Sequence, residues 1–129
     1  MNPKQFLVIG GVALVLLAVL GFFGVTGPTA EDSIFGTAWV FTGPENWAYL
    51  VLGIVALVAA FTVPAEVQKW LTVLIGVLAL VVAVWGFMVK DVASPNFLGG
   101  SNLENVADNV LHLVLGVWAL LASMGREEV

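Results

Sequence analysis

Four long apolar stretches dominate the pattern of hydrophobic and polar positions along the chain. They run over residues 6–23, 47–63, 70–89 and 106–124, and short polar segments separate them. Each stretch has close to the ~20 residues with which a helix crosses a hydrocarbon layer ~30 Å thick. Because a bilayer cannot hydrogen-bond an exposed backbone, a helix is the expected conformation for all four. The pattern therefore predicts an all-α integral membrane protein, a four-transmembrane-helix bundle that forms a single membrane domain over residues 1–129.

The chain also repeats itself. A shift of 65 residues places the first stretch on the third, so that Lys4 coincides with Lys69. A shift of 63 residues places ENWAYLVLGIVALVAA of the second stretch on DNVLHLVLGVWALLAS of the fourth. Internal symmetry of this kind is typical of membrane proteins built from repeated units. We predict two parallel helical-hairpin repeats, about 4–62 and about 69–125, because a unit with two crossings returns the chain to the same side.

Small residues recur at helical spacing within every stretch. Glycines in the first stretch have counterparts in the third, and a glycine in the second has a counterpart in the fourth. Since small residues let transmembrane helices approach closely, we predict that these glycines are helix-packing positions. They are Gly11, Gly21, Gly53, Gly76, Gly86 and Gly116.

Polar side chains gather where the second and fourth stretches begin. These side chains are Glu45, Asn46, Tyr49, Asp108, Asn109 and His112. The acids and amides fall in the first helical turn, where they cap exposed N–H groups and interact favourably with the helix dipole. Tyr49 and His112, one turn deeper on the glycine stripes, are expected to point into the bundle and hydrogen-bond between helices. We favour this structural interpretation of the six residues as a polar interhelical cluster.

The single histidine also admits a functional interpretation. Near acidic residues His112 could relay protons, and in an apolar helix it could supply an axial ligand to a single heme or a chlorophyll-type pigment. A relay needs a polar path across the membrane, whereas the stripes beyond the cluster continue only through Ala56, Ala60, Ala119 and Ser123. A metal ion is less well supported, because carboxylates at a helix start have a simpler role. We expect no metal and no cofactor, with a pigment on His112 as the alternative.

The composition and the absence of certain motifs exclude several classes of function. Hydrophobic residues make up 60% of the chain and charged residues 10%, and the mean hydropathy is +1.06. The absence of cysteine excludes disulfides and thiolate chemistry. A net charge of −5 leaves no basic patch for nucleic acid. The sequence has no phosphate-cradling glycine loop, no metalloprotease motif and no nucleophile placed near His112, so we expect no enzymatic activity.

Charge placement predicts an orientation. With four crossings, Lys4, Lys69 and Arg126 fall on one side, which the positive-inside tendency assigns to the cytoplasm. Lys90 falls on the other side and opposes this assignment. The expected location is the cell (inner) membrane, with both termini cytoplasmic.

The two outer connections differ in character. The first, about 25–44, carries several aromatic residues that suit the headgroup level. Either a short strand or a shallow re-entrant turn is compatible with residues 34–41. The second outer connection is shorter and richer in turn-forming residues.

The fourth stretch resembles a known family. NVADNVLHLVLGVWALLA is similar to the closing helix of a bacterial family of small four-helix membrane proteins catalogued as domain of unknown function 4383, whose members end in a motif like N-x-A-D-N-x-L-H-L-x-x-G. The resemblance implies the same four-helix fold over nearly the whole chain. Members commonly carry two histidines at the start of the second helix, in a pattern like N-P-L-H-N-L-V-H-L-x-x-G. This chain has Glu45 and Tyr49 there, beside the retained Asn46 and Gly53.

That departure bears on the histidine. If the family's histidines bind a metal or heme, this chain lacks two of the ligands, which favours a structural role for His112. The family has no assigned activity, so the resemblance implies a fold rather than a function. We predict a small non-enzymatic membrane protein with a structural or accessory role, which docks with other membrane protein subunits or with itself. Binding of an apolar cofactor or pigment through His112 is the alternative, and transport of a proton or small ion is a third.

Overall fold

The fold is that of a computed structural model, which describes residues 1–27, 29, 31–36, 43–89 and 106–125. These residues form four helices, α1 (Pro3–Phe22), α2 (Gly43–Thr62), α3 (Ala65–Val89) and α4 (Val106–Ser123), and no strand. By length and composition α1, α2 and α3 suit a membrane crossing, and α4 contributes a shorter apolar segment, Asn109–Ser123. The prediction of an all-helical protein with four helices is confirmed over the described residues. Both predictions for the outer connections rest on residues 37–42 and 90–105, which lie outside them.

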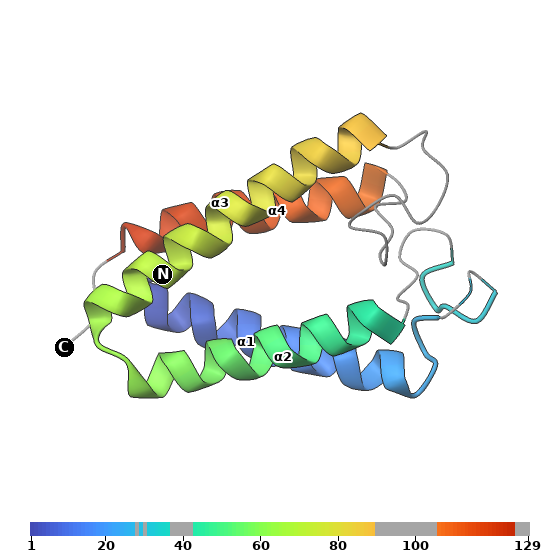
Figure 1. Cartoon of the computed structure of the whole chain (residues 1–129), viewed down its shortest axis with the longest axis horizontal. Helices are drawn as coiled ribbons and strands as arrows, with labels where there is room; N and C mark the ends of the chain where they lie inside the picture. The colour runs from blue at the N-terminus through green and yellow to red at the C-terminus, as the bar shows by residue number, and fades with distance from the viewer. Residues whose placement is uncertain (28, 30, 37–42, 90–105, 126–129) are drawn as a thin grey trace.

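The helices form two antiparallel pairs (Figure 1). α1 packs along α2 and α3 packs along α4, and contacts within each pair are far more extensive than contacts between the pairs. Met1, Gly125 and the tight α2–α3 turn lie at one end of the molecule, which we call the terminal end. The last residues of α1 and α3 and the first residues of α2 and α4 lie at the other end, which we call the loop end. Gly125 lies against Met1, so the first and last described residues are at the same end of the bundle.

A capping box fixes the start of α1 at the terminal end. Asn2 Oδ1 accepts a hydrogen bond from the Gln5 N–H at 2.9 Å, and Gln5 Oε1 accepts one from the Asn2 N–H at 3.0 Å. Pro3 follows at the first helical position, where a missing N–H costs nothing. The local sequence therefore encodes this helix start without help from the rest of the bundle.

Proline also separates α2 from α3. Pro64 has no N–H and disfavours helical geometry in the residue before it, so α2 ends at Thr62 and a new helix begins at Ala65. α3 thus begins five residues before the apolar stretch that predicted it, because its first turn is polar. One of those polar residues, Gln68, donates from Nε2 to the Ala60 carbonyl at 2.9 Å. The turn is therefore held by a side chain of α3 that caps the end of α2.

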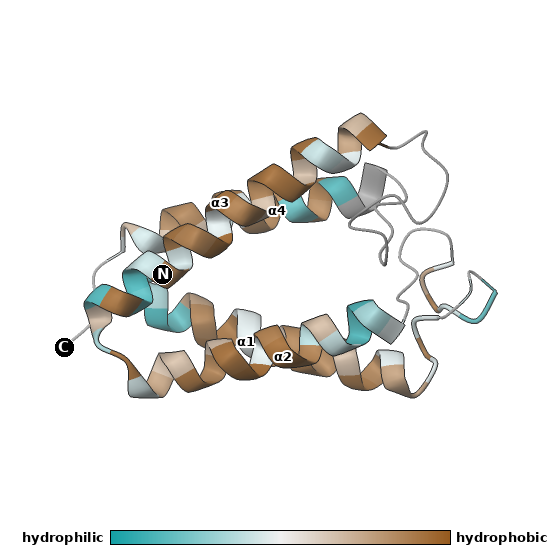
Figure 2. Ribbon diagram, viewed as in Figure 1, coloured by the Kyte–Doolittle hydropathy of each residue, from teal (hydrophilic) through white to brown (hydrophobic). Residues whose placement is uncertain are grey.

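The two pairs share one core, and it lies toward the terminal end. Its buried members, which come from α1, α2 and α4, are Phe6, Leu7, Ala59, Ala60, Ala119 and Ala122. Phe6 and Trp118 meet edge to face across the pairs, with ring centroids 4.6 Å apart. Apolar residues also cover the outward faces along the helix midsections, as Figure 2 shows. Large apolar side chains exposed all round a helical bundle are typical of a lipid-facing surface.

Candidate functional site

The amide of Asn46 packs into the contact between α1 and α2. Its side chain fills the volume beside Gly21, where a Cβ would overlap the amide group. Asn46 is buried, and its Oδ1 has no hydrogen-bond partner among the described residues. Only glycine at position 21 leaves room for the amide, so this polar side chain of the candidate cluster is part of helix packing.

Asn109 makes the equivalent contact between α3 and α4. Its amide lies against Gly86, and Asn109 is 0% exposed. Neither Oδ1 nor Nδ2 has a hydrogen-bond partner in the described part of the chain. The two positions are those related to Gly21 and Asn46 by the shifts of 65 and 63 residues. The same pair of residue types therefore makes the same contact in both helix pairs.

Two glycine contacts nearer the terminal end match in the same way. A Cβ on Gly53 would lie 2.9 Å from the Gly11 carbonyl oxygen, and a Cβ on Gly116 would lie 3.0 Å from the Gly76 carbonyl oxygen. Backbone therefore touches backbone at both places, which only glycine permits. All six glycines predicted as helix-packing positions lie at close contacts within a pair, with backbone or with an asparagine side chain.

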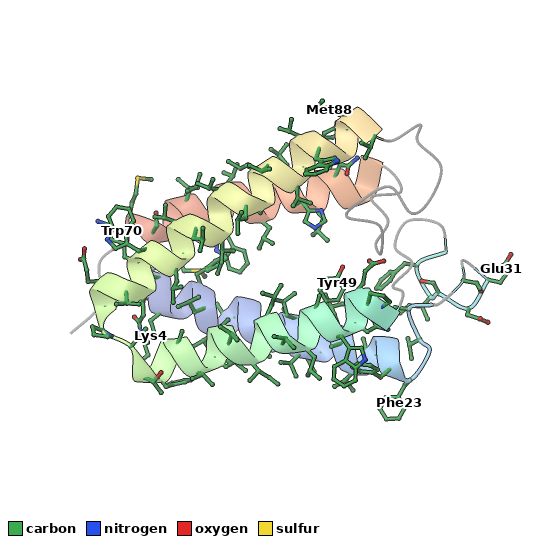
Figure 3. The ribbon with its side chains drawn as sticks, in the orientation of Figure 1. Lys4, Phe23, Glu31, Tyr49, Trp70 and Met88 are labelled. Atoms are coloured by element: carbon green, nitrogen blue, oxygen red, sulfur yellow. The ribbon has the colours of Figure 1, made fainter. Side chains whose placement is uncertain are left out.

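Tyr49 and His112 lie on a different face from the asparagines. Each is half-buried, and each comes seven residues, or two helical turns, before an alanine of the core between the pairs, Ala56 or Ala119. The predicted stripe on each helix thus serves two contacts: asparagine and glycine face the partner within the pair, and tyrosine or histidine faces the other pair. Figure 3 shows Tyr49 directed from α2 toward the α3–α4 pair.

The acidic members of the predicted cluster are placed only in part. Glu45 lies in the first turn of α2 and is buried. Asp108 lies in the first turn of α4, and its side chain is outside the described residues. The described residues contain no group of three His, Asp or Glu side chains that could hold a metal ion. Of the six residues, Asn46 and Asn109 pack within separate helix pairs.

Two buried polar residues of α3 were missed by the sequence analysis. Gln68 Nε2 also contacts the carbonyls of Ala59 and Val63, at 3.3 Å each, and Thr72 Oγ1 donates to the Gln68 carbonyl at 2.8 Å. Their spacing of four residues on one helix face, directly after a proline turn, was the available signal. Gln68 satisfies carbonyls at the α2–α3 turn, whereas Thr72 bonds the backbone within α3.

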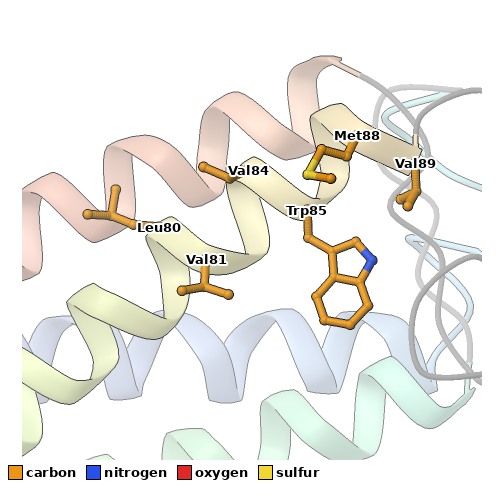
Figure 4. A pocket seen from close by; sticks show the side chains of 6 residues that line it. All are labelled: Leu80, Val81, Val84, Trp85, Met88 and Val89. Carbon is orange, nitrogen blue, oxygen red and sulfur yellow. The ribbon is translucent and has the colours of Figure 1, made fainter.

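An apolar recess of about 500 Å³ runs along α3 near the loop end. Among the described residues its lining comes from α3: Leu80, Val81, Val84, Trp85, Met88 and Val89 (Figure 4). Val84 and Met88 are among the exposed apolar side chains of the protein. The recess is open on its outer side and has no converging polar groups, unlike a typical small-molecule site.

Comparison with family models, with curated proteins and with solved structures found no match for this chain. The resemblance to the four-helix family therefore stays a prediction, and the proposals below rest on the geometry of the chain itself.

Proposed function

We propose that the protein is a non-enzymatic integral membrane protein, built from two copies of one helical hairpin, with an accessory role in a larger membrane assembly. The observation that carries the proposal is the matched pair of Asn–Gly contacts, Asn46 with Gly21 and Asn109 with Gly86. In each copy the most deeply buried polar side chain of the candidate cluster fills a helix contact. Both asparagines therefore serve packing, which supports a structural rather than a catalytic role for these polar residues.

An accessory role follows from what the bundle offers its surroundings. Its outward faces are apolar along almost their whole length, so a partner would have to meet it within the bilayer. The recess along α3 is the most distinctive part of this surface, because an exposed methionine and a tryptophan flank it (Figure 4). Methionine adapts its shape to an irregular partner, and aromatic residues are enriched at interfaces. We assign the docking face to this side of α3 and the partner to a transmembrane helix of another subunit.

The proposed orientation keeps the terminal end in the cytoplasm. Lys4 and Lys69 both lie at that end, and each ammonium group lies over an aromatic ring, Phe61 at 5.3 Å and Trp70 at 5.7 Å. Such pairs suit the boundary between lipid and water, where long basic side chains extend toward the aqueous phase.

Isolation from the native membrane tests the accessory role. The tagged chain, extracted in mild detergent and affinity-purified, is expected to copurify with one larger membrane protein in constant stoichiometry. Val84→Trp fills the α3 recess and should reduce recovery of that protein at least tenfold. Leu16→Trp is a matched control on α1, since Leu16 and Val84 are 58% and 59% exposed. A chain that runs alone, or equal recovery with both variants, would contradict the proposal.

A further inference from the structure

The core between the helix pairs occupies only the half of the bundle toward the terminal end. Ala59 on α2 belongs to that core and is 6% exposed, whereas Leu52, two turns nearer the loop end on the same face, is 57% exposed. α3 changes in the same way. Leu71 packs against the core, whereas Leu78, seven residues later, is 53% exposed. The faces that meet at the terminal end are thus separated toward the loop end, as the diverging pairs in Figure 1 show.

We call this separated region the interpair opening and define it by Tyr49, Leu52, Leu78, Trp85 and His112. Trp85 lies two turns beyond Leu78, is 40% exposed and points toward the α1–α2 pair in Figure 4. The deeper walls are hydrocarbon, because Leu52 and Leu78 lead directly to the core between the pairs. Tyr49 and His112 bring polar side chains at the rim nearer the loop end. The opening is therefore apolar toward the core and polar toward the loop end.

The depth of the opening matches one leaflet of a bilayer. Seven residues separate Tyr49 from Ala56 and eleven separate Leu78 from Val89. At 1.5 Å per residue these spans are roughly 10 to 16 Å, and half of a ~30 Å hydrocarbon layer is about 15 Å. The opening also ends where a leaflet ends: Ala56, Ile75 and Leu115, which pack against the core, lie near the middle of their helices and close the opening there.

This shape selects among possible occupants. A transmembrane helix is about 10 Å wide and continues through both leaflets, so the closed half of the bundle would block its path. A flexible hydrocarbon chain needs only one leaflet and can follow a space that narrows with depth. Leaving the opening empty within the membrane would forfeit dispersion contacts on both walls.

We propose that the interpair opening binds one lipid from the leaflet at the loop end, with its hydrocarbon chain between Leu52 and Leu78 and its polar head near Tyr49 and His112. The lipid completes the core that the protein builds only halfway and so fixes the angle between the two helix pairs. The shared chemistry is a flexible hydrocarbon chain on a polar head, which a phospholipid or an isoprenoid lipid supplies. The proposal does not rest on docking along α3: Trp85 lines both the opening and the recess, but Tyr49, Leu52, Leu78 and His112 do not line the recess.

Native mass spectrometry of the full chain, extracted from its membrane in mild detergent, tests the proposal. We expect the wild-type protein to retain one lipid per chain after detergent exchange. Leu52→Trp and Leu78→Trp each fill the opening from one side, and each should lower the lipid-bound fraction at least tenfold. The mass of the released molecule then distinguishes a phospholipid from an isoprenoid lipid, and either one supports the proposal.

The controls separate this site from ordinary lipid contact. Leu16→Trp makes the same change on an exposed face of α1 and should leave the bound lipid in place, as should Val84→Trp in the α3 recess. Helix content and thermal unfolding of each variant, followed by circular dichroism, show whether lipid loss reflects misfolding. Wild-type protein without a retained lipid would overturn the proposal. Equal loss in the control variants, a dimer in place of the lipid, or a bound molecule with heme or pigment absorbance bands would do the same.

Discussion

Gly86 on α3 and Asn109 on α4 compete for one volume: the asparagine amide fills the space that a side chain at position 86 would need. The same relationship holds between Gly21 and Asn46 in the other helix pair. In a bilayer, where burial of apolar surface gives helices no advantage over lipid, such close contacts are a main source of helix association.

Gly86→Ala and Gly21→Ala are therefore expected to destabilise the bundle by about 1–3 kcal/mol each, the usual effect of overpacking. Thermal or denaturant unfolding in detergent, followed by circular dichroism, measures the change. Gly10→Ala is the matched control, because a Cβ at position 10 meets no atom within 4 Å. That control should be neutral or slightly stabilising, since alanine favours a helix more than glycine does. Equal destabilisation by all three variants would argue against the Asn–Gly contacts.

Gly53→Ala and Gly116→Ala test whether the two pairs are equivalent packing units. A Cβ on either would approach a backbone carbonyl oxygen of the facing helix, which cannot rotate away as a side chain can. We expect losses of similar size, about 1–3 kcal/mol each. The double variant should lose the sum, because the two glycines have no contact partner in common. Losses that differ severalfold, or strong non-additivity, would contradict two equivalent hairpins.

Asn109→Leu tests whether the buried amide stabilises the protein. Neither polar atom of Asn109 has a hydrogen-bond partner among the described residues, so its burial there is a cost, and leucine has the same branching of heavy atoms. We expect a change in unfolding free energy within about 1 kcal/mol. Asn109→Asp, with the same shape, should cost several kcal/mol as a buried carboxylate. A large loss on Asn109→Leu would instead reveal a hydrogen-bond partner of the amide beyond the described residues.

Gln68→Met tests the side-chain cap at the α2–α3 turn. Methionine keeps the length of the side chain but removes the Nε2 donor that serves the carbonyls at the end of α2. The Ala59 carbonyl keeps its bond from the Val63 N–H, but the Ala60 carbonyl loses the Gln68 donor, which should cost about 1–3 kcal/mol in the same unfolding experiment. Thr62→Ala is the comparison, because the Thr62 hydroxyl donates to the Val58 carbonyl within the same helix at an exposed position. Little change is expected there, and equal effects would count against the cap.

The sequence alone predicted the four helices and the six packing glycines, because apolar length and small-residue spacing are local signals. It did not separate Asn109 from His112, although they are three residues apart. A step of three residues turns a helix by about 300°, so side chains three residues apart point in different directions. Each can therefore contact a different neighbouring helix. Which neighbour each residue meets depends on how the pairs are arranged. The same limit explains why the partial core between the pairs was not foreseen: exposure of Leu52 and Leu78 is a property of the angle between pairs.

The angle between the two helix pairs can be tested by cross-linking. The chain has no cysteine, so introduced cysteine pairs can be cross-linked without background. At the terminal end, a Cβ on Gly125 would overlap the backbone of Met1, so Met1→Cys with Gly125→Cys should react rapidly with a short bifunctional thiol reagent. Leu52→Cys with Leu78→Cys lies on the two walls of the interpair opening and should react only with a longer reagent.

The same cross-linking rates can be compared before and after lipid is removed with harsh detergent. If a bound lipid holds the pairs apart, stripping it with harsh detergent should change the rate at the loop end by several fold. The rate at the terminal end, where Phe6 and Trp118 pack together, should stay the same. Rapid reaction of both pairs with the short reagent in native membranes would mean that the two helix pairs lie parallel and closed along their whole length. The opening would then be absent from the protein in its membrane.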